Sequence, residues 1–144
     1  MSAEENKALV RRYLDEILNK GNLDVLDEVM DPNYVNPTIP IGRTPGGRER
    51  YKRGVSLDRS AFPDIQIRLE SVIAEGDLVA YHSVWTGTHL GMFRGIAPTG
   101  KRVEWRATCY RRVKDGRLVE GWGTYDWLGL PEQLGASVTS PQDA

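Results

Sequence analysis

The chain has few of the residues on which many catalytic and metal sites depend. It contains one cysteine, Cys109, and two histidines, His82 and His89, in 144 residues. One thiol excludes an intrachain disulfide and a cysteine-rich zinc site. The two histidines form no HxxxH or HxH pattern, and seven residues apart on a strand they face opposite sides, so we expect no metal site. The GxSxG, CxxC and glycine-rich phosphate-loop motifs are also missing.

Charge excess and long apolar runs are missing as well. The chain carries 19 basic and 20 acidic residues, whereas a nucleic-acid binder usually shows a basic excess. No apolar run approaches the roughly 20 residues of a membrane span. The N-terminus MSAEENKALVRR is polar and acidic, whereas a signal peptide is basic and then apolar. We therefore expect a soluble cytoplasmic protein with no nucleic-acid or membrane partner.

The length suits one domain with a core and one pocket. We assign residues 1–136 to this single domain and expect residues 137–144 to form a polar tail. No internal repeat or low-complexity segment suggests a second unit.

Helical periodicity is present in the N-terminal part. Ser2 and Glu5 have the spacing of a capping box, and apolar residues then recur at helical spacing. Residues 22–30 predict a second short helix, with Asn22 as its cap and Pro32 as its stop.

A third helix and then four strands are expected further along. The helix covers residues 46–61, and its many charges indicate a solvated face. After it, long segments alternate between polar and apolar residues and are rich in β-branched and aromatic types. Helices followed by strands indicate an α+β fold, in which three N-terminal helices pack on a strongly curved, mostly antiparallel sheet. Such a sheet forms a cone with an inner cavity. The predicted strands are residues 64–74, 77–89, 101–113 and 116–127.

Strand periodicity gathers large and very small residues on one face. Trp105, Ala107 and Cys109 share that face on the third predicted strand, and Gly123 and Tyr125 share it on the last. Small residues among large ones leave space, so this face is the candidate wall of a pocket. A lone small thiol such as Cys109 is more often core than nucleophile.

Four aromatic residues divide between the two faces of the sheet. Trp85 and Trp105 could form an aromatic wall for a flat or polyene substrate, or ordinary core, and the two roles are compatible. Tyr110 and Trp122 fall on the opposite face and fit a dimer surface better than a pocket.

Two polar residues are candidates for chemistry. Asp126 ends the last strand among aromatic residues, where burial would raise its pKa and suit it to proton transfer. An aspartate before a Leu-Gly-Leu-Pro turn also commonly caps that turn, and both roles stay open. Asn36 could orient a carbonyl group or form an Asx-type turn before Pro37.

Four segments of the chain together resemble a known protein family: ENKALVRRYLDEILNKGNLDVLDEVMDPNYVNP, AFPDIQIRLESVIAEGDLVAYHSVWTGTH, FRGIAPTGKRVEW and VKDGRLVEGWGTYDWLGLPEQLG. They resemble the SnoaL-like polyketide cyclases, or ester cyclases, of the NTF2-like superfamily. Order, spacing and turn positions match over nearly the whole chain, and the combination of TGTH, GIAPTG and the C-terminal pattern WG…D.LGL..QLG is specific for the family. The resemblance implies a curved-sheet cone with a deep apolar pocket, a homodimer and no cofactor.

The resemblance also marks where this chain departs from its family. The family's aldol cyclases move a proton with one aspartate on the last strand, and that position corresponds to Gly123 here. The family's pocket histidine and glutamine correspond to Cys109 and Ala107. Asn36 matches a family asparagine, and Asp126 matches a different, widespread aspartate. The three replacements predict a larger, more apolar pocket with no aldol base at Gly123.

We therefore expect a cofactor-independent cyclase of natural-product biosynthesis that folds an apolar polyketide-type substrate in its pocket. Ring closure would rest more on shape than on a dedicated base, for instance in a cycloaddition. Two alternatives stay open: an aldol or epoxide-opening cyclase, or a hydrolase, that uses Asp126, and a non-catalytic dimer that binds a small ligand. The expected catalytic residues are Asp126 and Asn36, and the expected substrate-binding residues are Tyr34, Tyr51, Trp85, His89, Met92, Trp105, Cys109, Gly123 and Tyr125.

Overall fold

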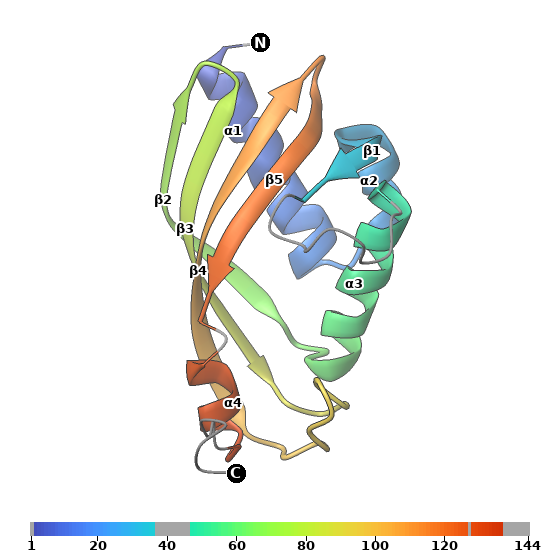
Figure 1. Cartoon of the computed structure of the whole chain (residues 1–144), viewed down its shortest axis with the longest axis vertical. Coiled ribbons are helices and arrows are strands. Elements are labelled where there is room, and N and C mark those ends of the chain that lie inside the picture. The colour runs from blue at the N-terminus through green and yellow to red at the C-terminus, as the bar shows by residue number, and fades with distance from the viewer. Residues whose placement is uncertain (1, 37–46, 127, 137–144) are drawn as a thin grey trace, which may run out of the picture.

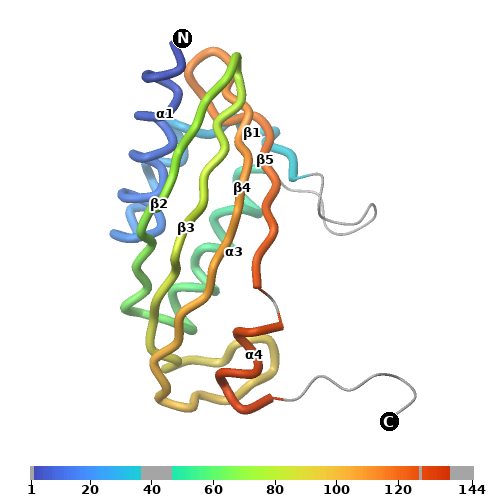
Figure 2. Tube along the Cα trace, turned by 90° about the vertical axis from the view of Figure 1, so that its left-hand side faces the viewer, coloured from blue at the N-terminus to red at the C-terminus, as the bar shows by residue number. Residues whose placement is uncertain are grey.

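One five-stranded sheet with helices against one face makes up the protein in a computed structural model, which describes residues 2–36, 47–126 and 128–136. The strand order is β1-β5-β4-β3-β2. Helices α1 and α3 lie on the same side of the sheet, and α4 lies beyond the end of β5 (Figures 1 and 2). The elements are α1 (Ala3–Arg12), η1 (Tyr13–Asn19), η2 (Leu23–Val25), α2 (Leu26–Val29), β1 (Met30–Val35), α3 (Gly47–Ala61), β2 (Gln66–Glu75), β3 (Leu78–Thr88), β4 (Arg102–Lys114), β5 (Arg117–Tyr125) and α4 (Gly129–Gln133). The polar tail expected at 137–144 lies outside the described residues.

The first helix begins where its capping box predicts. The hydroxyl of Ser2 accepts a hydrogen bond from the Glu5 N–H (3.1 Å), and the Glu5 carboxylate accepts one from the Ser2 N–H (3.0 Å). The two bonds satisfy donors that a helix start otherwise leaves open. The helix continues through the π-helical η1, and its apolar side is buried against the sheet. That side consists of Val10, Tyr13, Leu14, Ile17 and Leu18.

The second helix is shorter than predicted. It consists of the 3-10 turn η2 and the single α-turn α2, and Met30 already belongs to β1. The prediction of a helix through Met30 with its stop at Pro32 was wrong, because Met30 pairs in parallel with Leu118 of β5 and the extended chain runs through the proline. Asn22 does occupy the N-cap position, as predicted, although its side chain makes no capping hydrogen bond.

The four predicted strands are present as β2 to β5. Their three pairings are antiparallel, and the short β1 adds a parallel edge to β5. The α+β prediction with a mostly antiparallel sheet is confirmed. The alternation is strict on β4, where the face toward the helices buries Val103, Trp105, Ala107, Cys109, Arg111 and Val113.

The core fills the space between this inner face and the helices. It forms one cluster of buried residues that runs from Val10 on α1 to Leu134 just after α4. Register shifts within β2 and near the end of β4 mark bulges, which increase the local twist of the sheet. Within the described residues no helix is long and apolar enough to cross a membrane.

Candidate active site

A cavity of about 330 Å³ opens between α3, β1 and the inner face of the sheet. Its size lies at the lower end of the range typical of small-molecule sites. Aromatic residues are the most numerous group in its wall, which also carries the polar or charged side chains of Asn36, Arg50, Asp58 and Arg94. The aromatic residues that line it are Tyr34, Tyr51, Phe62, Trp85, Phe93, Trp105 and Tyr125.

A stacked tryptophan pair forms the wall on the sheet side. Trp85 and Trp105 are direct partners in the β3–β4 register, and their rings stack with centroids 5.8 Å apart. Tyr125 meets Trp85 edge-on at 5.7 Å. The Trp85 indole donates to the Ser83 hydroxyl (3.0 Å), which donates to the Ala107 carbonyl oxygen (3.2 Å). These bonds fix the orientation of the Trp85 ring, so this part of the wall is preformed.

Asp58 is the carboxylate that the wall presents to the cavity, and it was not among the residues predicted from the sequence. It lies on α3, where we had interpreted the charges as a solvated face. Burial raises the pKa of its carboxyl to about 6, against the opposing effect of the Arg94 charge. A signal for it exists in the sequence, since Tyr51, Val55, Asp58 and Phe62 follow the spacing of one helical face.

Asp126 does not line this cavity. It is exposed, and its carboxylate accepts a hydrogen bond from the Gly129 N–H at 2.8 Å, across the turn that leads into α4. Of the two roles that the sequence left open, this geometry is that of a turn cap. Asn36, the second expected catalytic residue, does line the cavity.

Gly123 and Cys109 lie behind the wall rather than in it. A β-carbon built on Gly123 would come 2.7 Å from the Cys109 sulfur and 3.1 Å from the Tyr125 ring. The space beside Gly123 is thus filled by Cys109 and Tyr125, and of these two Tyr125 lines the cavity. The larger pocket expected from Gly123 therefore has no direct counterpart beside this glycine.

Two other expected binding residues also lie off the cavity. His89 is completely buried, packs against Phe62 at 5.6 Å and accepts a hydrogen bond from the Thr99 N–H at 3.2 Å. Met92 is 62% exposed. Tyr34, Tyr51, Trp85, Trp105 and Tyr125 are the five expected binding residues that the fold brings together.

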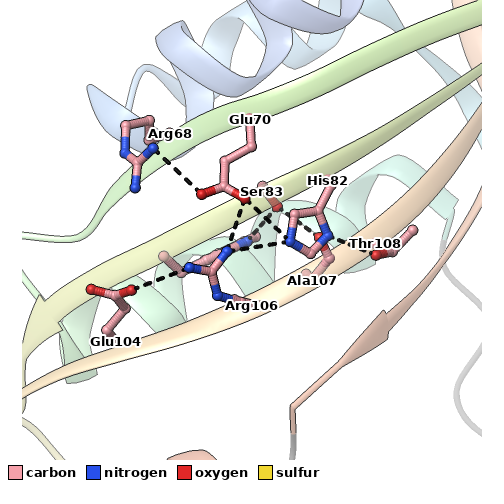
Figure 3. Close-up of polar contacts among 9 residues, drawn as sticks. Arg68, Glu70, His82, Ser83, Glu104, Arg106, Ala107 and Thr108 are labelled. Carbon is pink, nitrogen blue, oxygen red and sulfur yellow. Dashed lines mark hydrogen bonds and ion pairs between the residues drawn. The ribbon is translucent and has the colours of Figure 1, made fainter.

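The other histidine belongs to a polar network on the opposite face of the sheet, which Figure 3 shows. His82 bonds to the Thr108 hydroxyl (2.9 Å), and Arg106 donates to Glu70 (2.9 Å) beside it. The two histidines thus lie on opposite sides, as predicted. No group of three or more His, Cys, Asp and Glu side chains within residues 2–36, 47–126 and 128–136 is placed to hold a metal ion.

Comparison with known proteins agrees with this architecture. Residues 8–134 match the family described as SnoaL-like polyketide cyclase. The chain is 30% identical to the nogalonic acid methyl ester cyclase of Streptomyces nogalater over 81% of its own length and 88% of the relative. It is 30% identical to the aklanonic acid methyl ester cyclase AcmA of Streptomyces galilaeus, over 91% of each chain.

A solved structure extends the match to three dimensions. TsrD from Streptomyces laurentii superposes with a TM-score of 0.86 at 25% identity, covering 95% of this chain and 99% of that one. The predicted NTF2-like cone is confirmed by this likeness. The protein therefore belongs to the SnoaL-like polyketide cyclase family and is an enzyme of that kind.

Proposed function

We propose that the protein closes a ring within an apolar polyketide-type substrate held in the aromatic cavity, in the biosynthesis of a natural product. The stacked Trp85–Trp105 wall is the observation that carries the proposal, because a fixed aromatic surface favours one folded conformation of a flexible substrate. The curated relatives are named as cyclases of nogalonic and aklanonic acid methyl esters, which supports a polyketide-type ester as the substrate.

Asp58 is our candidate for the group that moves the proton. Among the described residues that line the cavity it is the acidic one, and its pKa of about 6 lies near the pH at which an enzyme works. In the proposed step its carboxylate removes a proton from a carbon between two carbonyl groups. That carbon then attacks a third carbonyl, and the new alkoxide takes up a proton. Gly123, at the position of the family's aldol base, has no side chain for this task.

The test is product formation. Wild-type protein incubated with aklanonic acid methyl ester is expected to convert it to a compound of unchanged mass and new retention time, because intramolecular aldol closure is an isomerisation. Trp105→Ala should slow this conversion at least about tenfold. An unchanged rate in Trp105→Ala would contradict the proposed role of the wall.

We also propose that the protein is a homodimer that pairs through the outer face of the sheet. Tyr110 and Trp122 stack there with centroids 5.7 Å apart, and Ile73 is 69% exposed nearby on β2. Aromatic surface surrounded by polar groups, such as the His82 network of Figure 3, is typical of interfaces between subunits.

A further inference from the structure

Behind the inner wall of the cavity lies a buried arginine without an acidic partner among the described residues. Arg111 of β4 is 4% exposed. Its guanidinium donates to the Tyr110 carbonyl oxygen (3.0 Å) and to the Tyr13 hydroxyl (3.4 Å), while its Nε has no hydrogen-bond partner there. A guanidinium keeps its charge when buried, and a buried charge without compensation is costly. The arrangement therefore suggests that the missing negative charge arrives with a ligand.

Tyrosine rings partly stabilise the buried charge of Arg111, and their hydroxyls connect it to the cavity. The guanidinium lies over the faces of Tyr13 (5.5 Å) and Tyr81 (5.6 Å). The Tyr13 hydroxyl is also hydrogen-bonded to the Tyr51 hydroxyl, and Tyr51 lines the cavity. Because arginine can only donate, the Tyr13 hydroxyl accepts a hydrogen bond from Arg111 and can donate its own O–H to the Tyr51 hydroxyl. That direction leaves the Tyr51 O–H free to donate into the cavity.

A second hydroxyl approaches the same place. Tyr34 lines the cavity, is 6% exposed, and its hydroxyl oxygen has no hydrogen-bond partner among the described residues. A β-carbon on Gly121 would come 2.7 Å from the Arg111 Nη1 atom and closer still to the Tyr34 hydroxyl. Only a residue without a side chain lets the two groups lie together here.

The two hydroxyls remain protonated at neutral pH. Burial raises the pKa of Tyr34, and it raises the pKa of Tyr51 to about 12, although the Arg111 charge opposes both shifts. Both tyrosines are therefore hydrogen-bond donors with a positive charge behind them. Donors fixed in this way in a site of low polarity stabilise negative charge on oxygen more strongly than water does.

We propose that Tyr34 and Tyr51, backed by Arg111, form a binding site for an oxyanion of the substrate. The ligand class is a polyketide with an acidic enol or phenol, whose enolate or phenolate oxygen accepts hydrogen bonds from the two tyrosines. Arg111 acts through them as a positioning residue. The inference rests on the proposed function, since it assigns chemistry to the same cavity.

Two probes of one shape separate the oxyanion site from the cavity as a whole: 2-hydroxyanthraquinone, which ionises, and anthraquinone, which does not. Absorbance titration of bound 2-hydroxyanthraquinone should give a phenol pKa at least about one unit below its value in free solution. Tyr34→Phe should weaken phenolate binding about tenfold and change anthraquinone binding less than twofold. Its Tm should stay equal or rise, because the lost hydroxyl has no partner.

Matched variants complete the test. Tyr110→Phe removes a hydroxyl from the outer face, and Arg112→Met removes a charge from the opposite side of the same strand, so neither should alter the phenol pKa. Arg111→Met should return the pKa of the bound phenol toward its value in solution. If Arg111→Met does not fold, the binding of the two probes to Tyr34→Phe tests the oxyanion site instead. Equal losses for both probes in Tyr34→Phe, or a bound phenol pKa at or above the solution value, would overturn the oxyanion site alone. If neither probe bound the wild type, the proposed cavity function would fail with it.

Discussion

At the scale of single residues, the position of a carboxylate matters more than its presence. Asp126 and Asp58 both lie near aromatic residues in the sequence, but one caps a turn in solvent and the other faces the cavity. The difference shows in the pKa of Asp58, which burial raises to about 6. A carboxyl whose folded-state pKa lies above its unfolded value binds protons more tightly when folded. Its contribution to stability is therefore present at low pH and is lost as the pH rises through about 6.

Asp58→Asn should accordingly raise the free energy of unfolding at pH 7.5 by about 1–2 kcal/mol and change it little at pH 4. Thermal melts at the two pH values check this. Asp64→Asn is the matched control with the opposite sign, because hydrogen bonds from Thr88 lower the pKa of Asp64. That variant should lose stability at pH 7.5. A loss of stability in Asp58→Asn at pH 7.5 would contradict a carboxylate whose pKa is raised by partial burial.

At the scale of elements, strands were predictable and short helices were not. Period-two alternation assigns each strand residue to a face, so the inner position of Trp105 and the outer position of Trp122 followed from the sequence. The boundary between α2 and β1 at Met30 could not be predicted in the same way. The strand conformation of Met30 depends on a parallel partner 88 positions along the chain, Leu118. Asp58 was missed for a related reason: charges on a helix reveal neither which of them face inward nor that a cavity lies there.

The packing of side chains beside Gly123 could not be predicted from the sequence either. A face assignment places Gly123 and Cys109 inward, but only the three-dimensional packing shows that the Tyr125 ring occupies the room beside them. Small residues on a strand thus predicted the correct face and not the cavity wall.

Two glycines provide a prediction at this scale. Gly54 lies within α3, and a β-carbon there would meet nothing within 4 Å. Gly54→Ala should therefore stabilise the fold by about 0.5–1 kcal/mol through helix propensity. Gly121→Ala should instead destabilise it by about 1–3 kcal/mol, since its methyl group would overlap Tyr34 and Arg111. Chemical denaturation compares the two, and equal effects would contradict the packing described around β5.

At the scale of the whole molecule, the two faces of the sheet have different roles. The face toward the helices forms the core and the cavity, and the outer face carries the Tyr110–Trp122 pair and the polar network. A curved sheet leaves its outer face uncovered by any described helix (Figure 2), and that uncovered face is the basis of the proposed homodimer.

Sedimentation velocity is the direct check on that pairing. Wild-type protein should sediment as a dimer, and Trp122→Glu as a monomer with unchanged secondary structure, because a charge placed in an aromatic interface loses its water. Lys114→Glu, a charge change near the end of β4, serves as the control and should remain dimeric. A monomeric wild type would contradict the proposal.

The turnover of two carboxylate variants tests the central claim most directly. Asp58→Asn and Asp126→Asn each replace one carboxylate by an amide, and both can be assayed for ring closure of the same polyketide methyl ester between pH 5 and 8. The structure predicts that Asp58→Asn lowers kcat at least about 100-fold, that Asp126→Asn stays within about threefold of wild type, and that the wild-type rate falls below pH 6. The opposite order of the two variants, or an Asp58→Asn rate equal to wild type, would contradict the account.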